Sequence, residues 1–209
     1  MPESSRTTTV LAISCLSGGS GKSTTVLNLA TMLSEKGKTL VVDFDPQGNL
    51  SQWLGWTDLS GSATIAETIL PDTDRIKITS IIKLPTNEDR SGRLLLAPSD
   101  YSLSRAVDAI AIEPGRERFL KRALKPVLGD YDFIVIDSPP SKGILTYNAI
   151  LAADFLVIPT ECTNKGVMGA VSTVVLVKEL IEGKILLFHL ELLNLAYLIL
   201  ALASQNTRR

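Results

Sequence analysis

Residues 17–24 have the composition of a loop that binds phosphate. They read SGGSGKST, with glycines ahead of one lysine and two hydroxyl side chains. Glycines let backbone N–H groups close around phosphate oxygens, and a helix that starts there adds the partial positive charge of its N-terminus. Lys22 should reach the β- and γ-phosphates, and the Ser23 hydroxyl should ligate Mg²⁺. The residues expected to bind the nucleotide here are Gly18, Gly19, Ser20, Gly21, Lys22, Ser23 and Thr24.

Carboxylates follow two apolar runs elsewhere in the chain. Asp43 and Asp45 lie in VVDFDPQG, and Asp137 ends the run FIVID. The Asp- and Pro-rich stretch after Val42 is also typical of a simple turn. In the functional interpretation, one carboxylate of the Asp43–Asp45 pair orients the water that attacks the γ-phosphate, and Asp137 holds the Mg²⁺ shell.

The elements that must position these residues alternate between strands and helices. Apolar, β-branched runs predict strands over residues 8–16, 38–48, 93–99, 131–140 and 154–161. Helical patterns are expected over residues 22–37, 100–112, 116–128, 144–152 and 166–181, with a short helix near residues 64–70. This alternation predicts an α/β fold, a mostly parallel sheet with helices on both faces. Ligands of such sheets bind at the carboxyl ends of the strands, where the loop and the carboxylates fall.

Size, charge and composition limit the function classes. A chain of 209 residues with 45% hydrophobic and 21% charged residues is expected to fold as one globular domain. Its net charge of −1 means that nucleic-acid binding would need a local basic patch. The N-terminus has no apolar signal-peptide core, and the two cysteines, Cys15 and Cys162, lack metal-site spacing, so we expect a cytoplasmic protein with idle thiols.

Three stretches together resemble the ParA/MinD family of deviant Walker ATPases, and its ParA branch most. They are SGGSGKST, DFDPQGNLSQWLG and YDFIVIDSPPSKGILTYNAILAADFLVIPTE, and the resemblance covers about residues 8–181. It implies a P-loop NTPase-like fold that binds ATP and Mg²⁺ and forms an ATP-sandwich homodimer. It also implies nonspecific binding to nucleoid DNA, and hydrolysis stimulated by a cargo-bound ParB-like or McdB-like activator. Lys22 and Ser23 would bind phosphate and Mg²⁺, Asp45 would orient the water, Asp137 would be the Walker-B carboxylate, and Asp43 would support the metal shell.

The sequence departs from the family pattern at one charged residue. The family's lysine that crosses the dimer to the partner's phosphates should precede Gly18, where this chain has Ser17. Many relatives read PPSLG after the Walker-B strand, whereas this chain reads PPSKG with Lys142. We hypothesise that Lys142 supplies the missing charge as a third catalytic residue, since an ammonium on a flexible stem can act from another backbone position. The alternative is an ordinary solvated loop lysine. The missing loop lysine also resembles the carboxysome-positioning subfamily of cyanobacteria.

Residues 116–125, RERFLKRALK, are one candidate surface for DNA. Arg118, Lys121, Arg122 and Lys125 fall near one helical side, and the chain ends in two arginines. A solvated helix face is the alternative interpretation. Nonspecific binding requires only such phosphate contacts.

Residues 183–209 depart from the family pattern, so the chain is divided into an ATPase domain over residues 1–182 and an atypical apolar tail. The tail contains KILLFHLELLNLAYLILALASQNTRR. A frameshifted or truncated end is favoured, and an amphipathic helix that packs or touches a membrane stays open. A transmembrane span is disfavoured because His189, Glu191 and Asn194 interrupt it.

The function expected from the sequence is a cytoplasmic, nucleoid-associated ATPase that positions a plasmid, a chromosome or a carboxysome, with membrane binding not expected. Two alternatives remain. One is a MinD-like spatial regulator that associates with a membrane through its apolar tail. The other is a truncated, inactive member of the family that keeps the fold and the dimer surface.

Overall fold

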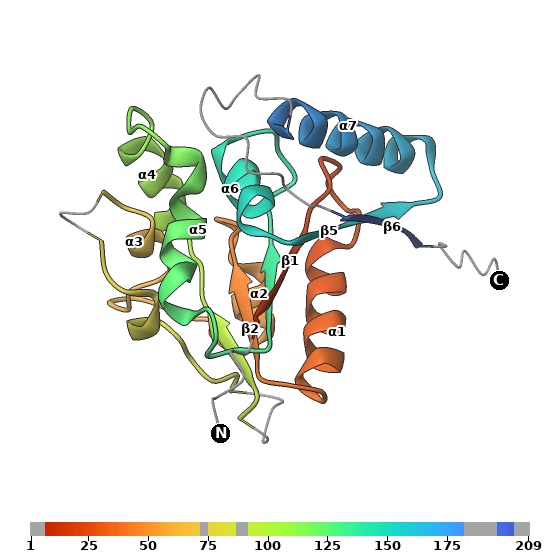
Figure 1. The fold of residues 1–209 in the computed structure, drawn as a ribbon. Coiled ribbons are helices and arrows are strands. Elements are labelled where there is room, and N and C mark those ends of the chain that lie inside the picture. The colour runs from red at the N-terminus through yellow and green to blue at the C-terminus, as the bar shows by residue number, and fades with distance from the viewer. Residues whose placement is uncertain (1–6, 72–74, 87–91, 182–195, 203–209) are drawn as a thin grey trace.

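The protein is built around one sheet of parallel strands (Figure 1). The computed structural model describes residues 7–71, 75–86, 92–181 and 196–202. The strands are β1 (Thr9–Ile13), β2 (Thr39–Asp43), β3 (Leu94–Ala97), β4 (Phe133–Asp137), β5 (Phe155–Glu161) and β6 (Ala196–Leu202). Their order across the sheet is β3-β2-β4-β1-β5-β6, and each neighbouring pair is parallel. The predicted α/β class and parallel sheet are confirmed.

Helices cover both faces of the sheet. They are α1 (Lys22–Ser34), α2 (Asn49–Trp53), α3 (Ile65–Thr68), α4 (Ser102–Ala109), α5 (Phe119–Leu124), α6 (Ile144–Ala152) and α7 (Asn164–Ile181), with short 3₁₀ turns at Ile78–Ser80, Arg116–Arg118 and Lys125–Val127. In Figure 1, α1 lies on one side of the sheet, α4 and α5 on the other, and α7 at the upper end.

Alternating side chains of the strands form two cores. In β1, Val10 and Ala12 point into the larger cluster, which also holds the buried residues of α3 to α7, whereas Ile13 points into the smaller one with Val26 of α1. Successive side chains of a strand point to opposite faces. A strand covered on both sides therefore has a continuous apolar sequence, and such runs predict β2 and β4.

The helix predicted over residues 116–128 is wrong as a single element. Two 3₁₀ turns flank α5, which is six residues long. Gly115 has φ +71° ahead of the first turn, and Pro126 lies within the last one. Since proline has no N–H to donate and its ring crowds the preceding turn, the α-helix ends before it.

The tail beyond α7 is described for seven residues. β6 pairs with β5 in parallel register, from Phe155–Ala196 to Glu161–Leu202. A helix was one interpretation of the tail, and over Ala196–Leu202 the chain is a strand instead. The rest of the tail, residues 182–195 and 203–209, lies outside the described residues, and the frameshift interpretation stays a prediction. Among the described helices, none combines the length and the apolar character needed to cross a bilayer.

Candidate nucleotide site

The phosphate loop (residues 14–21) joins β1 to α1 at the carboxyl edge of the sheet. Gly19 and Gly21 have φ values of +80° and +78°, in the left-handed region that glycine adopts at little cost. Gly21 also caps α1 without any side-chain bond, so the first N–H groups of this 13-residue helix are free to bind an anion. No heavy atom lies within 4 Å of where a Cβ of Gly18 or Gly19 would stand, so this stretch of the loop is open.

Lys22 lies against the backbone of this loop. Its Nζ donates to the Ser17 carbonyl at 3.1 Å and to the Ser20 hydroxyl at 3.5 Å. The side chain is 7% exposed. Burial lowers the pKa of Lys22, while the carboxylates of Asp137 and Asp45 act in the opposite direction. The cation and two of the predicted carboxylates therefore belong to one electrostatic site.

Asp43 and Asp137 are neighbours at the ends of adjacent strands. They are register partners in the parallel pair of β2 and β4, and Ile13 of β1 is the partner of Asp137 on the other side. Both carboxyl groups are buried. Burial, together with the charge of Asp43, raises the pKa of Asp137 to about 7 against the opposing effects of Ser23 and Lys22.

Asp137 has the environment of a carboxylate that holds a cation. Neither of its oxygens has a hydrogen-bond partner of good geometry among the described residues, although the Ser23 hydroxyl is close enough to lower its pKa. A buried charge without partners is costly. A hard divalent cation with oxygen ligands is the group that such a carboxylate and a neighbouring hydroxyl fit. Ser23 and Asp137 are thus brought together, as predicted for Mg²⁺.

Asp43 is as deeply buried but is fully bonded. Its Oδ2 accepts from the N–H and the hydroxyl of Ser51, at 2.8 and 2.7 Å, and its Oδ1 accepts from the N–H of Asp45 at 3.3 Å. Burial raises the pKa of Asp43 to about 6 despite these bonds. Asp45 itself is partly exposed, and its Oδ1 accepts from the N–H of Gln47 at 3.0 Å.

Ser17 lies beneath helix α7, a contact that the sequence did not reveal. A Cβ placed on Gly169 would stand 2.5 Å from the Cβ of Ser17. One turn further along, the hydroxyl of Thr173 accepts from the N–H of Leu16 at 3.0 Å and donates to the carbonyl of Gly169 at 2.7 Å. Ser17 is 8% exposed. A lysine at this position would have to leave the loop past α7.

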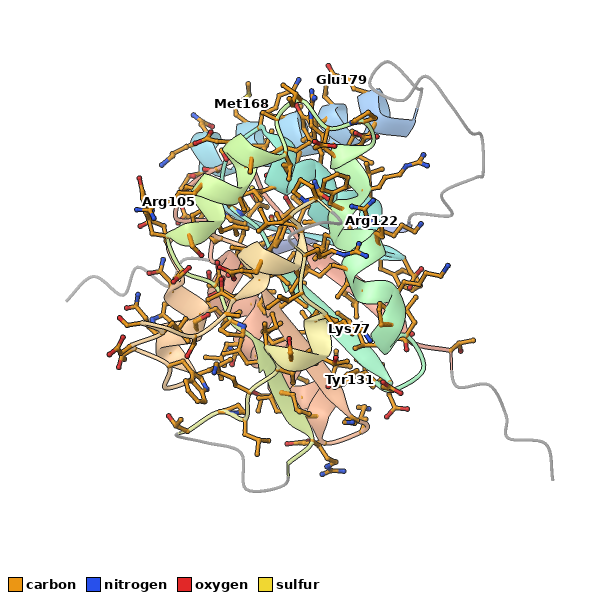
Figure 2. The ribbon with its side chains drawn as sticks, turned by 90° about the vertical axis from the view of Figure 1, so that its left-hand side faces the viewer. Lys77, Arg105, Arg122, Tyr131, Met168 and Glu179 are labelled. Atoms are coloured by element: carbon orange, nitrogen blue, oxygen red, sulfur yellow. The ribbon has the colours of Figure 1, made fainter. Side chains whose placement is uncertain are left out.

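Lys142 does not lie at the phosphate loop within the chain. Its Nζ forms an ion pair with Glu179 Oε2 at 2.8 Å, and the pair raises the pKa of Lys142. Figure 2 shows Glu179 toward one end of α7 and Met168 toward the other. Glu179 is ten residues beyond Gly169, which is about 15 Å along a helix. Lys142 thus remains a candidate only for a charge delivered to another subunit.

The basic residues of the broken helix are on the surface. Arg118, Lys121, Arg122 and Lys125 are all exposed. The guanidinium of Arg122 lies 4.2 Å from the centre of the Phe119 ring. Figure 2 shows Arg122 on α5 and Arg105 on α4, well separated on this side of the molecule.

Sequence reasoning missed three residues beside the site: Ser51, Ser99 and Gly169. Ser51 lies in the quoted stretch DFDPQGNLSQWLG and Ser99 follows β3 in RLLLAPS, so the signal available was a hydroxyl near a strand end. Gly169 has no side chain and left no signal beyond an interruption of a helical run.

Comparison with known proteins identifies relatives over most of the chain. The family described as "AAA domain" matches residues 8–187. The chain is 37% identical over 187 residues to the sporulation initiation inhibitor protein Soj of Bacillus subtilis, covering 85% of this chain and 71% of Soj. It is 38% identical over 176 residues to the maintenance of carboxysome distribution protein A of Synechococcus elongatus, covering 83% of this chain and 67% of that protein.

A solved structure has the same architecture. Cobyrinic acid a,c-diamide synthase from Mycobacterium smegmatis, with bound ADP and magnesium, matches with a TM-score of 0.77 at 30% sequence identity. The match covers 93% of this chain and 74% of that one. The relatives are longer than this chain, which spans 71% of Soj and 46% of a Mycobacterium tuberculosis relative that is 40% identical.

Replacing Asp137 by Asn should stabilise the nucleotide-free protein at alkaline pH. The pKa of about 7 in the folded protein lies above the ordinary value of 3.8 for an aspartate carboxyl. The protonated carboxyl therefore favours folding below pH 4, and this contribution is lost as the pH rises to 7. Urea unfolding should give equal stability for both proteins near pH 4, and up to about 4 kcal/mol more for Asp137→Asn at pH 8. Asp130→Asn, an exposed change before β4, is the control. Equal stabilities of wild type and Asp137→Asn at pH 8 would contradict the raised pKa of Asp137.

Proposed function

The chain belongs to the ParA/MinD family of ATPases, and from this we propose that it hydrolyses ATP and uses the cycle to position a cargo in the cell. The observation that carries the proposal is the buried Asp137 carboxylate without a partner, set beside Lys22 at a phosphate loop. This arrangement is suited to a Mg²⁺–nucleotide complex. A ParA from Myxococcus xanthus is named for chromosome partitioning and the Synechococcus relative for carboxysome distribution, which supports a positioning role.

The reaction follows from the residues at the carboxyl edge. The N–H groups of the phosphate loop and the N-terminus of α1 bind phosphate oxygens, and Lys22 holds the β- and γ-phosphates. Asp137 and the Ser23 hydroxyl would hold Mg²⁺, which would supply positive charge to offset that of the phosphates. Asp43 supports the metal shell from the adjacent strand. Asp45 orients a water for in-line attack on the γ-phosphate, and the fixed charges stabilise the transition state.

The cycle that we propose uses two protein states and two partners. ATP-bound subunits form a sandwich homodimer, and the dimer binds nucleoid DNA without sequence preference. A cargo-bound ParB-like or McdB-like protein stimulates hydrolysis, and hydrolysis releases the dimer from the DNA. The cargo is a plasmid, a chromosome or a carboxysome, and the protein acts in the cytoplasm. Lys142 supplies the charge that Ser17 lacks. Its surface ion pair with Glu179 contributes little to stability, so the lysine can exchange that pair for a phosphate contact.

Asp45→Ala tests the activity. The variant should bind ATP as the wild type does, while kcat falls about 100-fold or more, because the water loses its orienting base. Phosphate release gives kcat, and titration with a fluorescent ATP analogue gives the affinity. Asp130→Ala, which removes an exposed charge before β4, is the matched control. Wild-type turnover in Asp45→Ala would refute the assigned role.

Lys142→Ala tests the source of the trans charge. ATP-dependent dimers, measured by light scattering after gel filtration, should disappear in this variant and persist in Lys178→Ala, which changes an exposed lysine on α7. Lys165→Ala is a further arm, because Lys165 is exposed in the first turn of α7, four residues before Gly169. If dimers are lost with Lys165→Ala and kept with Lys142→Ala, the trans charge comes from Lys165 on α7 and the role proposed for Lys142 is wrong.

The DNA surface is tested by salt dependence. Each phosphate contact contributes about 0.9 to the slope of log K against log salt concentration. The double variant Lys121→Ala/Lys125→Ala should therefore bind duplex DNA of any sequence more weakly, with a slope smaller by about 2. The control is Lys36→Ala/Lys178→Ala, which removes one exposed lysine after α1 and one on α7. Equal slopes for both double variants would exclude residues 116–125 as the DNA surface.

A further inference from the structure

We propose that Ser51 and Ser99 are positioning residues that hold Asp45 in place for hydrolysis. The inference rests on the proposed ATPase function and extends it to two buried hydroxyl groups. Both side chains are essentially excluded from solvent, Ser51 at 0% and Ser99 at 1% exposure. They connect the end of β2 and the nearby helix α2 to the turn after β3, which is distant in the sequence.

The first part of the connection fixes Ser51 to the end of β2. Its hydroxyl donates to Asp43 Oδ2 at 2.7 Å, and its backbone N–H donates to the same oxygen at 2.8 Å. Hydrogen bonds to a carboxylate are short and about twice as strong as neutral ones. Ser51 is therefore anchored to the strand that carries Asp43.

The second part connects Ser51 to the loop that carries Asp45. The Ser51 hydroxyl accepts from the N–H of Ser99 at 2.9 Å. The Ser99 hydroxyl in turn donates to the backbone carbonyl of Asp45 at 2.9 Å. That carbonyl also accepts from the N–H of Gly48 at 3.0 Å. The backbone of Asp45 is thus held from the β3 side by Ser99 and from its own turn by Gly48.

Close packing reinforces the hydrogen bonds. Gly48 has φ +61°, and a Cβ placed on it would stand 2.6 Å from the carbonyl oxygen of Ser99. The same contact borders a cleft of about 400 Å³, whose lining includes Pro46, Gly48 and Ser99. The contacts with Ser99 therefore hold the Asp45 loop to the turn after β3 at the edge of this cleft.

The connection reaches the residues of the chemical step and bypasses the phosphate loop. It starts at Asp43, the register partner of Asp137, and ends at the backbone of Asp45. Within the described part of the chain, no hydrogen bond joins Ser51 or Ser99 to Lys22 or to residues 14–21. A small displacement of a reacting group can cost up to about 100-fold in rate. Loss of either hydroxyl should therefore lower turnover and leave nucleotide binding intact.

The test separates kcat from ATP affinity in three variants. Ser99→Ala and Ser51→Ala should each lower kcat about 10-fold, with the dissociation constant for ATP changed less than about 2-fold. The double variant should lose less than the product of the single losses, because both hydroxyls act through one chain of contacts. Gly48→Ala disturbs the contact between the Asp45 loop and Ser99 by steric overlap, without removing a hydroxyl. It should also lower kcat.

The matched control is Ser34→Ala. Ser34 is a buried serine whose hydroxyl donates to a backbone carbonyl, that of Thr31 at 2.7 Å, at the far end of α1. It should cost similar stability and leave kcat unchanged. Wild-type kcat in Ser99→Ala and Gly48→Ala, or a rise in the dissociation constant with kcat unchanged, would overturn the inference. A wild-type protein without turnover would instead refute the ATPase function, so the two failures are distinguishable.

Discussion

The site depends on how three charged side chains are compensated after their removal from water. Lys22, Asp43 and Asp137 are each less than a tenth exposed at the carboxyl edge of the sheet. Burial of a charge is tolerated where other groups pair with it or donate to it. Asp43 accepts three hydrogen bonds, and Lys22 donates to a carbonyl and a hydroxyl. Asp137 has no hydrogen bond of good geometry among the described residues, so its charge is the least compensated of the three.

The phosphate loop and the loop of Asp45 are anchored to different parts of the molecule. Helix α7 holds the phosphate loop through the Thr173–Leu16 bond and the contact of Gly169 with Ser17. The turn after β3 holds the loop of Asp45 through Ser99. Between them lies the row Ile13–Asp137–Asp43, fixed by the register of three parallel strands. The sheet therefore sets the distance between the loops. Each loop is held by a different element, the phosphate loop by α7 and the loop of Asp45 by the turn after β3.

The sequence predicted the sheet and the positions of the charged residues because both follow from local patterns. A strand buried on both faces is an apolar run, and Asp43 and Asp137 mark the ends of two such runs. The contacts of Ser51 with Ser99 and of Ser17 with Gly169 join residues far apart in the chain, and three of the four are serines that leave no periodic signal. Their roles depend on tertiary packing, which local patterns do not encode.

Ser17, which stands where the family has a lysine, lies in close contact with α7. Gly169 brings the backbone of α7 so close to Ser17 that even a methyl group on the helix would overlap its side chain. A long side chain at position 17 would have to extend past α7, beside the Thr173–Leu16 bond. The proposed charge for a partner subunit would have to come from a position that α7 leaves free. Lys142 meets this condition, since it is half exposed and its bond to Glu179 is a surface ion pair that costs little to give up.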